Sequence, residues 1–230
     1  MTSTRSTVPF STRQYSFREN CLDHCIYEPL VLRWRAEDSG WWICVKRGMT
    51  LSIEPQSRLF FALGCPAELR KTISRWRSSL SLRIGRPVPA ANFLLTLLFL
   101  GAVNKAQIAE ICAAASTVRV PGKRLTVVLD QLEVWRKSKV LVLTPQDALP
   151  ELMLLSYALE QAMLSFGQDQ ERKEYRPHLS LIRDFQSSVP EADNQPEFAL
   201  RADHFALYES HKGQYRVIAD WPLVQPDKAG

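Results

Sequence analysis

The sequence predicts an α+β protein whose second half repeats features of its first half. Segments with strand and helix patterns follow one another without the strict alternation that builds a parallel sheet. In addition, the stretches "ANFLLTLLFLG" (91–101) and "YRPHLSLIRDF" (175–185) share one rhythm. In each stretch a leading residue is followed by a leucine, a hydroxyl residue and a second leucine. We interpret this shared rhythm as a sign of internal duplication.

The first half opens with a strand, a helix and a second strand. The apolar run "RLFFALG" (58–64) predicts a strand that ends at Gly64. Pro66 suits the first turn of a helix, in which Leu69 and Ile73 have helical spacing. The run at 91–101 then predicts a buried strand.

A second helix and two further strands complete the first half. Asn104 is of a type that caps helices, and the apolar residues from Ile108 to Ala115 form one helical face. The segment "RLTVVLDQLEVW" (124–135) alternates like a single strand, and "KVLVLTP" (139–145) predicts another.

The second half begins with a helix and ends with strands. Apolar residues at helical spacing between 152 and 163 predict this helix, with Gly167 as its C-terminal cap. A strand is expected at 178–185. Two closing strands are expected at 198–210 and 215–223, joined by a turn that contains Gly213.

Residues 1–48 differ from the rest because they show no sustained period of 2 or 3.6. One interpretation is an extra segment that packs on the core. The other, which we favour, is that translation starts at Met49 and that the domain spans 49–230.

Composition limits the class of protein but does not identify it. The chain has 230 residues, 46% of them hydrophobic, and a net charge of +5, which suits one large domain or two lobes. No apolar run is long enough to span a membrane, and no secretory signal is evident. Five irregularly spaced cysteines do not indicate a disulfide framework, so we expect a cytoplasmic protein. The group of Cys21, His24 and Cys25 lacks the spacing of a zinc site, and we expect no metal.

The two related strands carry the candidate chemistry. Side chains of a strand alternate between its faces, so His178 and Ser180 project to the same side, and so do Leu94 and Thr96. A histidine can transfer protons near neutral pH, and a neighbouring hydroxyl can hydrogen-bond to a phosphoryl oxygen. Facing strands of this kind would suit hydrolysis of a phosphate ester.

Five segments in order, "RLFFAL", "NFLLTLLFLG", "KVLVLTP", "YRPHLSL" and "HFALYES", carry a wider resemblance. Between about Arg58 and Leu223 the chain resembles the bacterial RNA 2′,3′-cyclic phosphodiesterases, also called 2′-5′ RNA ligases. These hydrolases are two-histidine phosphoesterases with two H-x-T/S-x motifs (the HxTx motif). The resemblance implies a bilobal fold, with two related lobes of antiparallel sheets and outer helices around a central cleft. It also implies hydrolysis of RNA 2′,3′-cyclic phosphate ends to 2′-phosphate ends, without metal or cofactor.

The resemblance also implies roles for individual residues. In the family the first histidine is the proton donor and the second is the acceptor. His178 would activate the water, and Ser180 and Thr96 would hold phosphate oxygens. Arg176 could reach the phosphate or the RNA backbone, or could simply be a solvated arginine. Leu94 stands where the proton donor belongs, and leucine has no proton to give.

Three hypotheses follow from Leu94. The chain is a cyclic phosphodiesterase of reduced activity, or a non-catalytic protein that binds RNA ends or nucleotide phosphates, or Leu94 is an engineered change or a sequencing error. The expected partners are RNA ends or short oligonucleotides with a cyclic phosphate. We expect a monomer and no membrane association.

Overall fold

The computed structural model describes residues 56–80, 82–147, 149–166, 174–192 and 194–224, and the backbone of three short strands before them. The chain forms two units, Met1–Ile53 and Glu54–Gly230. No helix in these described segments is both long enough and apolar enough to cross a membrane.

The first unit contains a three-stranded antiparallel sheet in the order β1-β2-β3. Its strands are β1 (Arg33–Ala36), β2 (Trp42–Lys46) and β3 (Met49–Ser52). Because β3 pairs with β2, the structure divides the chain a few residues after the boundary expected at Met49. Most of residues 1–48 lie outside the described residues, so the origin of this segment stays a prediction.

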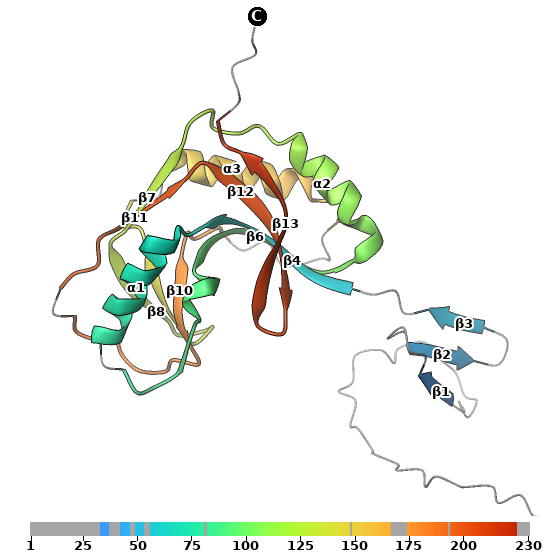
Figure 1. Ribbon diagram of the computed structural model, residues 1–230, viewed down its shortest axis with the longest axis horizontal. Coiled ribbons are helices and arrows are strands. Elements are labelled where there is room, and N and C mark those ends of the chain that lie inside the picture. Colours follow the sequence, from blue (N-terminus) through green and yellow to red (C-terminus); the bar gives the residue numbers. More distant parts are fainter. Residues whose placement is uncertain are drawn as a thin grey trace, which may run out of the picture. The chain divides into compact units, whose positions relative to one another are not determined.

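The second unit is built on an antiparallel four-stranded sheet with the order β13-β12-β4-β6 (Figure 1). Its strands are β4 (Gln56–Gly64), β6 (Leu94–Asn104), β12 (His204–His211) and β13 (Gln214–Pro222). Helix α3 (Pro150–Ala162) packs on β6, and α2 (Ile108–Ser116) lies beside α3. The side chain of Asn104 caps the short 3-10 turn before α2 by accepting a hydrogen bond from the backbone N–H of Ala106.

A second antiparallel sheet has the order β5-β10-β9-β8, and β7 pairs separately with β11. These strands are β5 (Arg86–Pro87), β7 (Leu125–Leu129), β8 (Gln131–Trp135), β9 (Val140–Thr144), β10 (Leu179–Arg183) and β11 (Phe198–Ala202). Helix α1 (Ala67–Ser79) contacts β11 through Trp76, whose ring meets that of Phe198 edge-on at 5.4 Å. The predicted α+β class with antiparallel sheets and outer helices is therefore confirmed.

Two of the predicted strands are each two strands. The segment 124–135 breaks at Asp130, and 198–210 breaks at Asp203. The breaks let the chain change sheets, because β7 pairs with β11 whereas β8 pairs with β9. Asp130 fixes the first break by accepting a hydrogen bond of 2.7 Å from the backbone N–H of Gln146. The expected cap at Gly167 lies outside the described residues.

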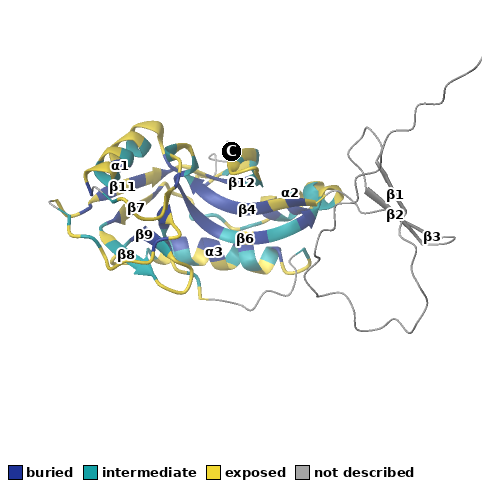
Figure 2. Cartoon of the chain, turned by 90° about the horizontal axis from the view of Figure 1, so that it is seen from below, coloured by how far each residue is buried: buried dark blue, intermediate teal, exposed yellow. Residues whose placement is uncertain are grey.

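The hydrophobic core includes leucines from both motif strands, β6 and β10. Buried residues concentrate in β4, β6, β9 and β12 (Figure 2). One large cluster includes Leu95 and Leu97 of β6 and Leu179 and Leu181 of β10. A separate small cluster, formed by Phe60, Ala62 and Leu94 with Tyr208 and Tyr215 packed against it, covers the opposite face of β4 and β6. We call it the aromatic cluster.

Candidate functional site

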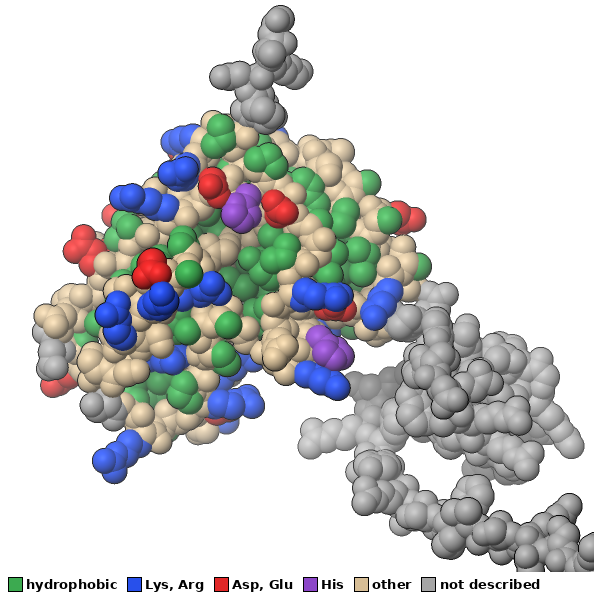
Figure 3. All heavy atoms as spheres, viewed as in Figure 1, with side chains coloured by type: hydrophobic (Ala, Val, Ile, Leu, Met, Phe, Trp, Pro, Cys, Tyr) green, Lys and Arg blue, Asp and Glu red, His purple; other side chains and the backbone are tan. Residues whose placement is uncertain are grey.

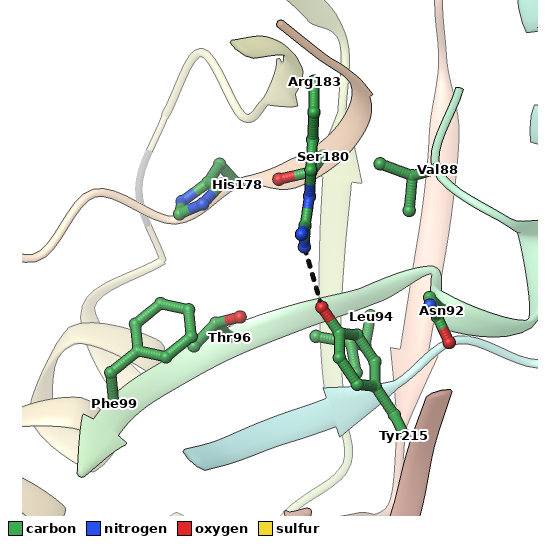
Figure 4. A pocket seen from close by; sticks show the side chains of 9 residues that line it. All are labelled: Val88, Asn92, Leu94, Thr96, Phe99, His178, Ser180, Arg183 and Tyr215. Carbon is green, nitrogen blue, oxygen red and sulfur yellow. Dashed lines mark hydrogen bonds between the residues drawn. The ribbon is translucent and has the colours of Figure 1, made fainter. Parts of the chain in front are cut away.

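An open pocket lies where β6 and β10 face each other (Figure 4). About 340 Å³ of space in the pocket and the open solvent at its mouth is free of protein atoms. Strand β10 and the residue before it supply one wall, and β6 with β13 supplies the other. The lining residues are Val88, Asn92, Leu94, Thr96, Phe99, His178, Ser180, Arg183 and Tyr215. The structure thus brings together four of the five residues expected at the site.

The two motif strands share a β-bulge at the same place. In β6, Phe61 pairs with Leu98 and Ala62 with Thr96, which leaves Leu97 as the extra residue. In β10, the pairing shifts between Ser180 and Ile182, which leaves Leu181 as the extra residue. Each bulge therefore follows directly after the motif hydroxyl, which supports the internal duplication.

The bulges change which residues face the pocket. Strict alternation along β6 would put Phe99 on the core face with Leu95 and Leu97, but Phe99 lines the pocket. A bulge adds one residue to a strand and so shifts the facing of the residues that follow by one, which in β6 holds up to a second bulge at Leu100. Phe99 therefore lines the pocket with Leu94 and Thr96, and Arg183 lines it with His178 and Ser180.

Both bulge carbonyls receive hydrogen bonds from helix side chains. The hydroxyl of Ser156 in α3 donates to the carbonyl oxygen of Leu97 at 2.8 Å. The guanidinium of Arg77 in α1 donates to the carbonyl oxygen of Leu181 at 3.2 Å. Buried carbonyl oxygens need hydrogen-bond partners, and that of Leu181 also accepts one of 2.9 Å from the backbone N–H of Val88. These two contacts hold the bulges, and with them the pocket faces of the strands, in place.

The ring of His178 is fixed by the backbone before β10. Its Nδ1 lies 2.8 Å from the carbonyl oxygen of Arg176. A carbonyl oxygen can only accept a hydrogen bond, so Nδ1 carries the proton and Nε2 of a neutral ring has a free lone pair. The indole of Trp135 packs against the imidazole, with ring centroids 4.3 Å apart. His178 is therefore oriented to accept a proton at Nε2.

The surroundings of His178 keep its imidazole neutral. Burial lowers the pKa of His178, the hydrogen bond to the Arg176 carbonyl raises it, and the charge of Arg176 lowers it, with a net decrease. The Arg176 guanidinium does not line the pocket. It forms an ion pair of 2.9 Å with Glu133 and lies 5.0 Å from the ring centroid of Trp135. Contact with phosphate through Arg176 stays a prediction.

The two motif hydroxyls are available to a ligand. Neither the Thr96 nor the Ser180 hydroxyl donates a hydrogen bond to any group in the described segments, and both line the pocket. The backbone of Thr96 is held in place, because the buried Tyr175 hydroxyl donates to its carbonyl oxygen at 3.1 Å. Burial raises the pKa of Tyr175, so this hydroxyl keeps the proton that it donates.

Leu94 is the apolar member of the pocket. Its side chain is 8% exposed and belongs to the aromatic cluster. Leu94 occupies the same place in its motif as His178 does in the second motif. Each residue lies two positions before the motif hydroxyl and three positions before the extra residue of the bulge. Leu94 and His178 therefore line facing walls of one pocket.

Arg183 and Tyr215 are pocket residues that the sequence reasoning missed. An Arg183 Nη donates a hydrogen bond of 2.9 Å to the Tyr215 hydroxyl across the pocket. Arg183 lies five residues after His178, just as Phe99 lies five residues after Leu94, and this correspondence was the available signal. Strict alternation assigned neither Arg183 nor Phe99 to the pocket. Tyr215 gave no local signal, because it reaches the pocket through the pairing of β13 with β12.

The other histidines of the described segments lie elsewhere. His204 is paired with Asp203 at 2.6 Å, and neither His204 nor His211 lines the pocket. Within those segments, no group of three or more His, Cys, Asp or Glu residues is arranged to hold a metal ion. The pocket offers one imidazole, a guanidinium and hydroxyls, which are groups suited to an anionic phosphate.

Comparison with known proteins connects this chain to one family. Residues 63–142 match the LigT-like phosphoesterase family. An RNA 2′,3′-cyclic phosphodiesterase of Escherichia coli (strain K12) is 33% identical over 177 residues, which cover 75% of this chain and 99% of that protein. A protein with the same name from Geobacillus stearothermophilus is 27% identical over 186 residues, which cover 74% of this chain and 58% of that protein.

Solved structures agree with the sequence matches. The crystal structure of E. coli LigT complexed with 3′-AMP has a TM-score of 0.68 and 31% identity, and the match covers 74% of this chain and all of that one, 100%. LigT complexed with phosphate gives a TM-score of 0.64 at the same 31% identity, over 74% of this chain and 99% of that chain. The chain belongs to the RNA 2′,3′-cyclic phosphodiesterase family of LigT-like phosphoesterases.

Proposed function

We propose that this protein hydrolyses RNA 2′,3′-cyclic phosphate ends to 2′-phosphate ends. The observation that carries the proposal is the fixed orientation of His178. Its Nδ1 donates to the Arg176 carbonyl, so Nε2 is free to accept a proton inside a pocket lined by the two motif hydroxyls and a guanidinium. Relatives named RNA 2′,3′-cyclic phosphodiesterase and the LigT complex with 3′-AMP support the choice of substrate.

The roles of the residues follow from their chemistry. Arg183, Thr96 and Ser180 donate hydrogen bonds to the phosphate oxygens, and these bonds strengthen as negative charge grows in the transition state. His178 takes a proton from water, and the resulting hydroxide attacks phosphorus. The bond between phosphorus and the 3′ oxygen then breaks. Leu94 cannot protonate that oxygen, so we expect slow turnover.

One face of the second unit carries positive charges that suit a polyanion. In the space-filling view, Lys and Arg side chains lie on both sides of a central hydrophobic area (Figure 3). Positive charge near a binding site raises affinity for nucleic acid in a salt-dependent way. RNA ends and short oligonucleotides with a cyclic phosphate are therefore the proposed substrates, and a monomer in the cytoplasm is the proposed setting.

Leu94 also favours a second candidate function. A protein that has lost its proton donor but has kept His178, Ser180, Thr96 and Arg183 still presents a complete set of phosphate ligands. The alternative is a non-catalytic protein that binds RNA ends or nucleotide phosphates.

Hydrolysis of a 2′,3′-cyclic phosphate dinucleotide decides between the two functions. We expect slow turnover to a 2′-phosphate that His178→Gln abolishes. His211→Gln is the matched control, because His211 is exposed and does not line the pocket. Binding of the dinucleotide without any turnover would establish the binding function, and turnover that survives His178→Gln would contradict the proposed role of His178.

A further inference from the structure

The wall of the pocket around Leu94 contains one hydroxyl that the motif does not include. Tyr215 reaches in from β13 and packs against the aromatic cluster, of which Leu94 is a member (Figure 4). Its ring meets Phe60 edge-on, with centroids 4.9 Å apart and planes at 71°. The Tyr215 hydroxyl therefore lies on the same wall as the missing proton donor.

The position of Tyr215 is fixed from two sides. The Asn92 side chain, two residues before Leu94, donates a hydrogen bond of 2.7 Å to the carbonyl oxygen of Gly213. This bond ties the β12–β13 turn to the start of β6. On the pocket side, the Arg183 guanidinium donates to the Tyr215 hydroxyl oxygen at 2.9 Å. A side chain held in this way presents its hydroxyl to the pocket in a defined orientation.

The hydrogen bond from Arg183 determines what the hydroxyl can do. A guanidinium only donates, so the phenol oxygen is the acceptor in this pair and its own proton is free for another acceptor. Tyrosine is among the side chains that act as general acids.

We propose that Tyr215 is the proton donor to the leaving oxygen in this chain, in place of the histidine absent at position 94. This inference rests on the proposed function. Water gives one proton to Nε2 of His178, and its oxygen forms a bond to phosphorus. The bond from phosphorus to the 3′ oxygen breaks, and that oxygen takes the Tyr215 proton. The phenolate beside Arg183 regains a proton from solvent, and His178 releases its own.

The test is Tyr215→Phe, measured on two substrates that differ in their leaving group. In a 2′,3′-cyclic phosphate the leaving group is an alkoxide, which leaves poorly unless it receives a proton. In a nucleoside p-nitrophenyl phosphodiester the leaving group is p-nitrophenolate, which needs no proton. Loss of a general acid should lower kcat on the cyclic phosphate by about 10²-fold or more. Turnover of the aryl diester should stay within about threefold of the parent.

Tyr208→Phe is the matched control. Tyr208 packs in the same aromatic cluster, stacked on Phe60 with centroids 5.4 Å apart, but it does not line the pocket. This variant should leave both substrates unaffected. A Tyr215→Phe variant that slows both substrates equally would make Tyr215 a support for Arg183 and overturn the inference. A variant that slows neither would overturn it as well.

A second background separates this inference from the proposed function. In a Leu94→His protein the new imidazole can donate the proton, so adding Tyr215→Phe should change turnover of the cyclic phosphate by no more than about threefold. An equal loss in both backgrounds would refute the inference while leaving the proposed function intact. Absence of turnover in the parent and in Leu94→His alike would overturn the proposed function, and the inference with it.

Discussion

Nδ1 of His178 donates a hydrogen bond of 2.8 Å to the carbonyl oxygen of Arg176, two residues earlier in the chain. This contact with the backbone fixes the tautomer of the imidazole, and no carboxylate or other side chain takes part in it. It leaves Nε2 as the basic atom in the pocket, and it ties the orientation of the ring to the backbone that enters β10. The same segment supplies Arg176, whose ion pair with Glu133 keeps its guanidinium away from the imidazole edge that faces the pocket.

The first prediction concerns the pH dependence of turnover. A base must be neutral to work, and burial and the Arg176 charge lower the pKa of His178 below its ordinary value of 6.5. Activity should therefore persist as pH falls through 6.5 and decline only at the lower, folded-state pKa. Trp135→Ala exposes the imidazole and should move this acid limb towards higher pH. A kcat/KM profile whose acid limb lies above 6.5 in the parent would contradict the prediction.

The second prediction concerns phosphate binding by Arg183. Hydrogen bonds to charged groups contribute about 1.5–3 kcal/mol, so Arg183→Met should weaken binding of a 2′-phosphorylated nucleotide by about 10- to 150-fold. Titration calorimetry at two salt concentrations measures this loss and a shallower salt dependence. Arg216→Met is the control, because it also removes one positive charge, from the residue next to Tyr215. The Arg216 side chain is paired with Glu209 and does not line the pocket. Equal losses in both variants would indicate a general charge effect instead of a contact.

The third prediction tests the bulge of β6. Ser156→Ala leaves the carbonyl oxygen of Leu97 without its donor in a buried place, which should lower the free energy of unfolding by about 1–3 kcal/mol. Ser78→Ala in α1 is the control, because its hydroxyl bonds to the carbonyl of Ser74 at the surface. That change should stay within about 0.5 kcal/mol. Urea denaturation of both variants gives the comparison, and equal stabilities would mean that the bulge does not depend on Ser156.

The sequence predicted the two motif strands, but it did not predict which of their later residues face the pocket. Period-2 alternation and the family resemblance located His178, Ser180, Thr96 and Leu94, and the structure places all four in one pocket. Alternation assumes that the side chains of successive residues always point to opposite faces of the strand. A bulge breaks this assumption at one residue, and the sequence does not mark that residue, because Leu97 and Leu181 are each followed by another apolar residue.

Contacts between segments that are distant in the chain could not be predicted from local sequence patterns either. Asp130 interrupts an alternating run whose two parts belong to different pairings, and the run itself carries no sign of the change. Tyr215 lines the pocket because β13 pairs with β12 and the Asn92 side chain holds the intervening turn. Such placements depend on the tertiary fold, so local patterns leave them open.

The fourth prediction concerns the segment before Met49. Strand β3 pairs with β2 within the first unit, and the described core cluster is formed by residues of the second unit. A chain that starts at Met49 should therefore unfold at the same temperature as the full chain. For a domain of this size, 1 kcal/mol corresponds to about 2–4 °C. A decrease of more than about 5 °C in thermal unfolding would show that the early residues stabilise the core.

The last prediction concerns Leu94→His. A positioned general acid contributes about 10²- to 10⁴-fold, so the variant should hydrolyse 2′,3′-cyclic phosphate ends faster than the parent, towards the lower end of that range if Tyr215 already donates a proton. Leu94 is 8% exposed within the aromatic cluster, so the polar ring should cost about 1–3 kcal/mol of stability, which thermal unfolding will show. Leu94→Gln is the control, since an amide can donate a hydrogen bond but cannot transfer a proton, and it should give no gain. Adding His178→Gln should remove the gain, because acid and base act as a unit. A folded Leu94→His protein that is no faster than the parent would show that position 94 no longer serves the reaction, and would favour the binding function for this pocket.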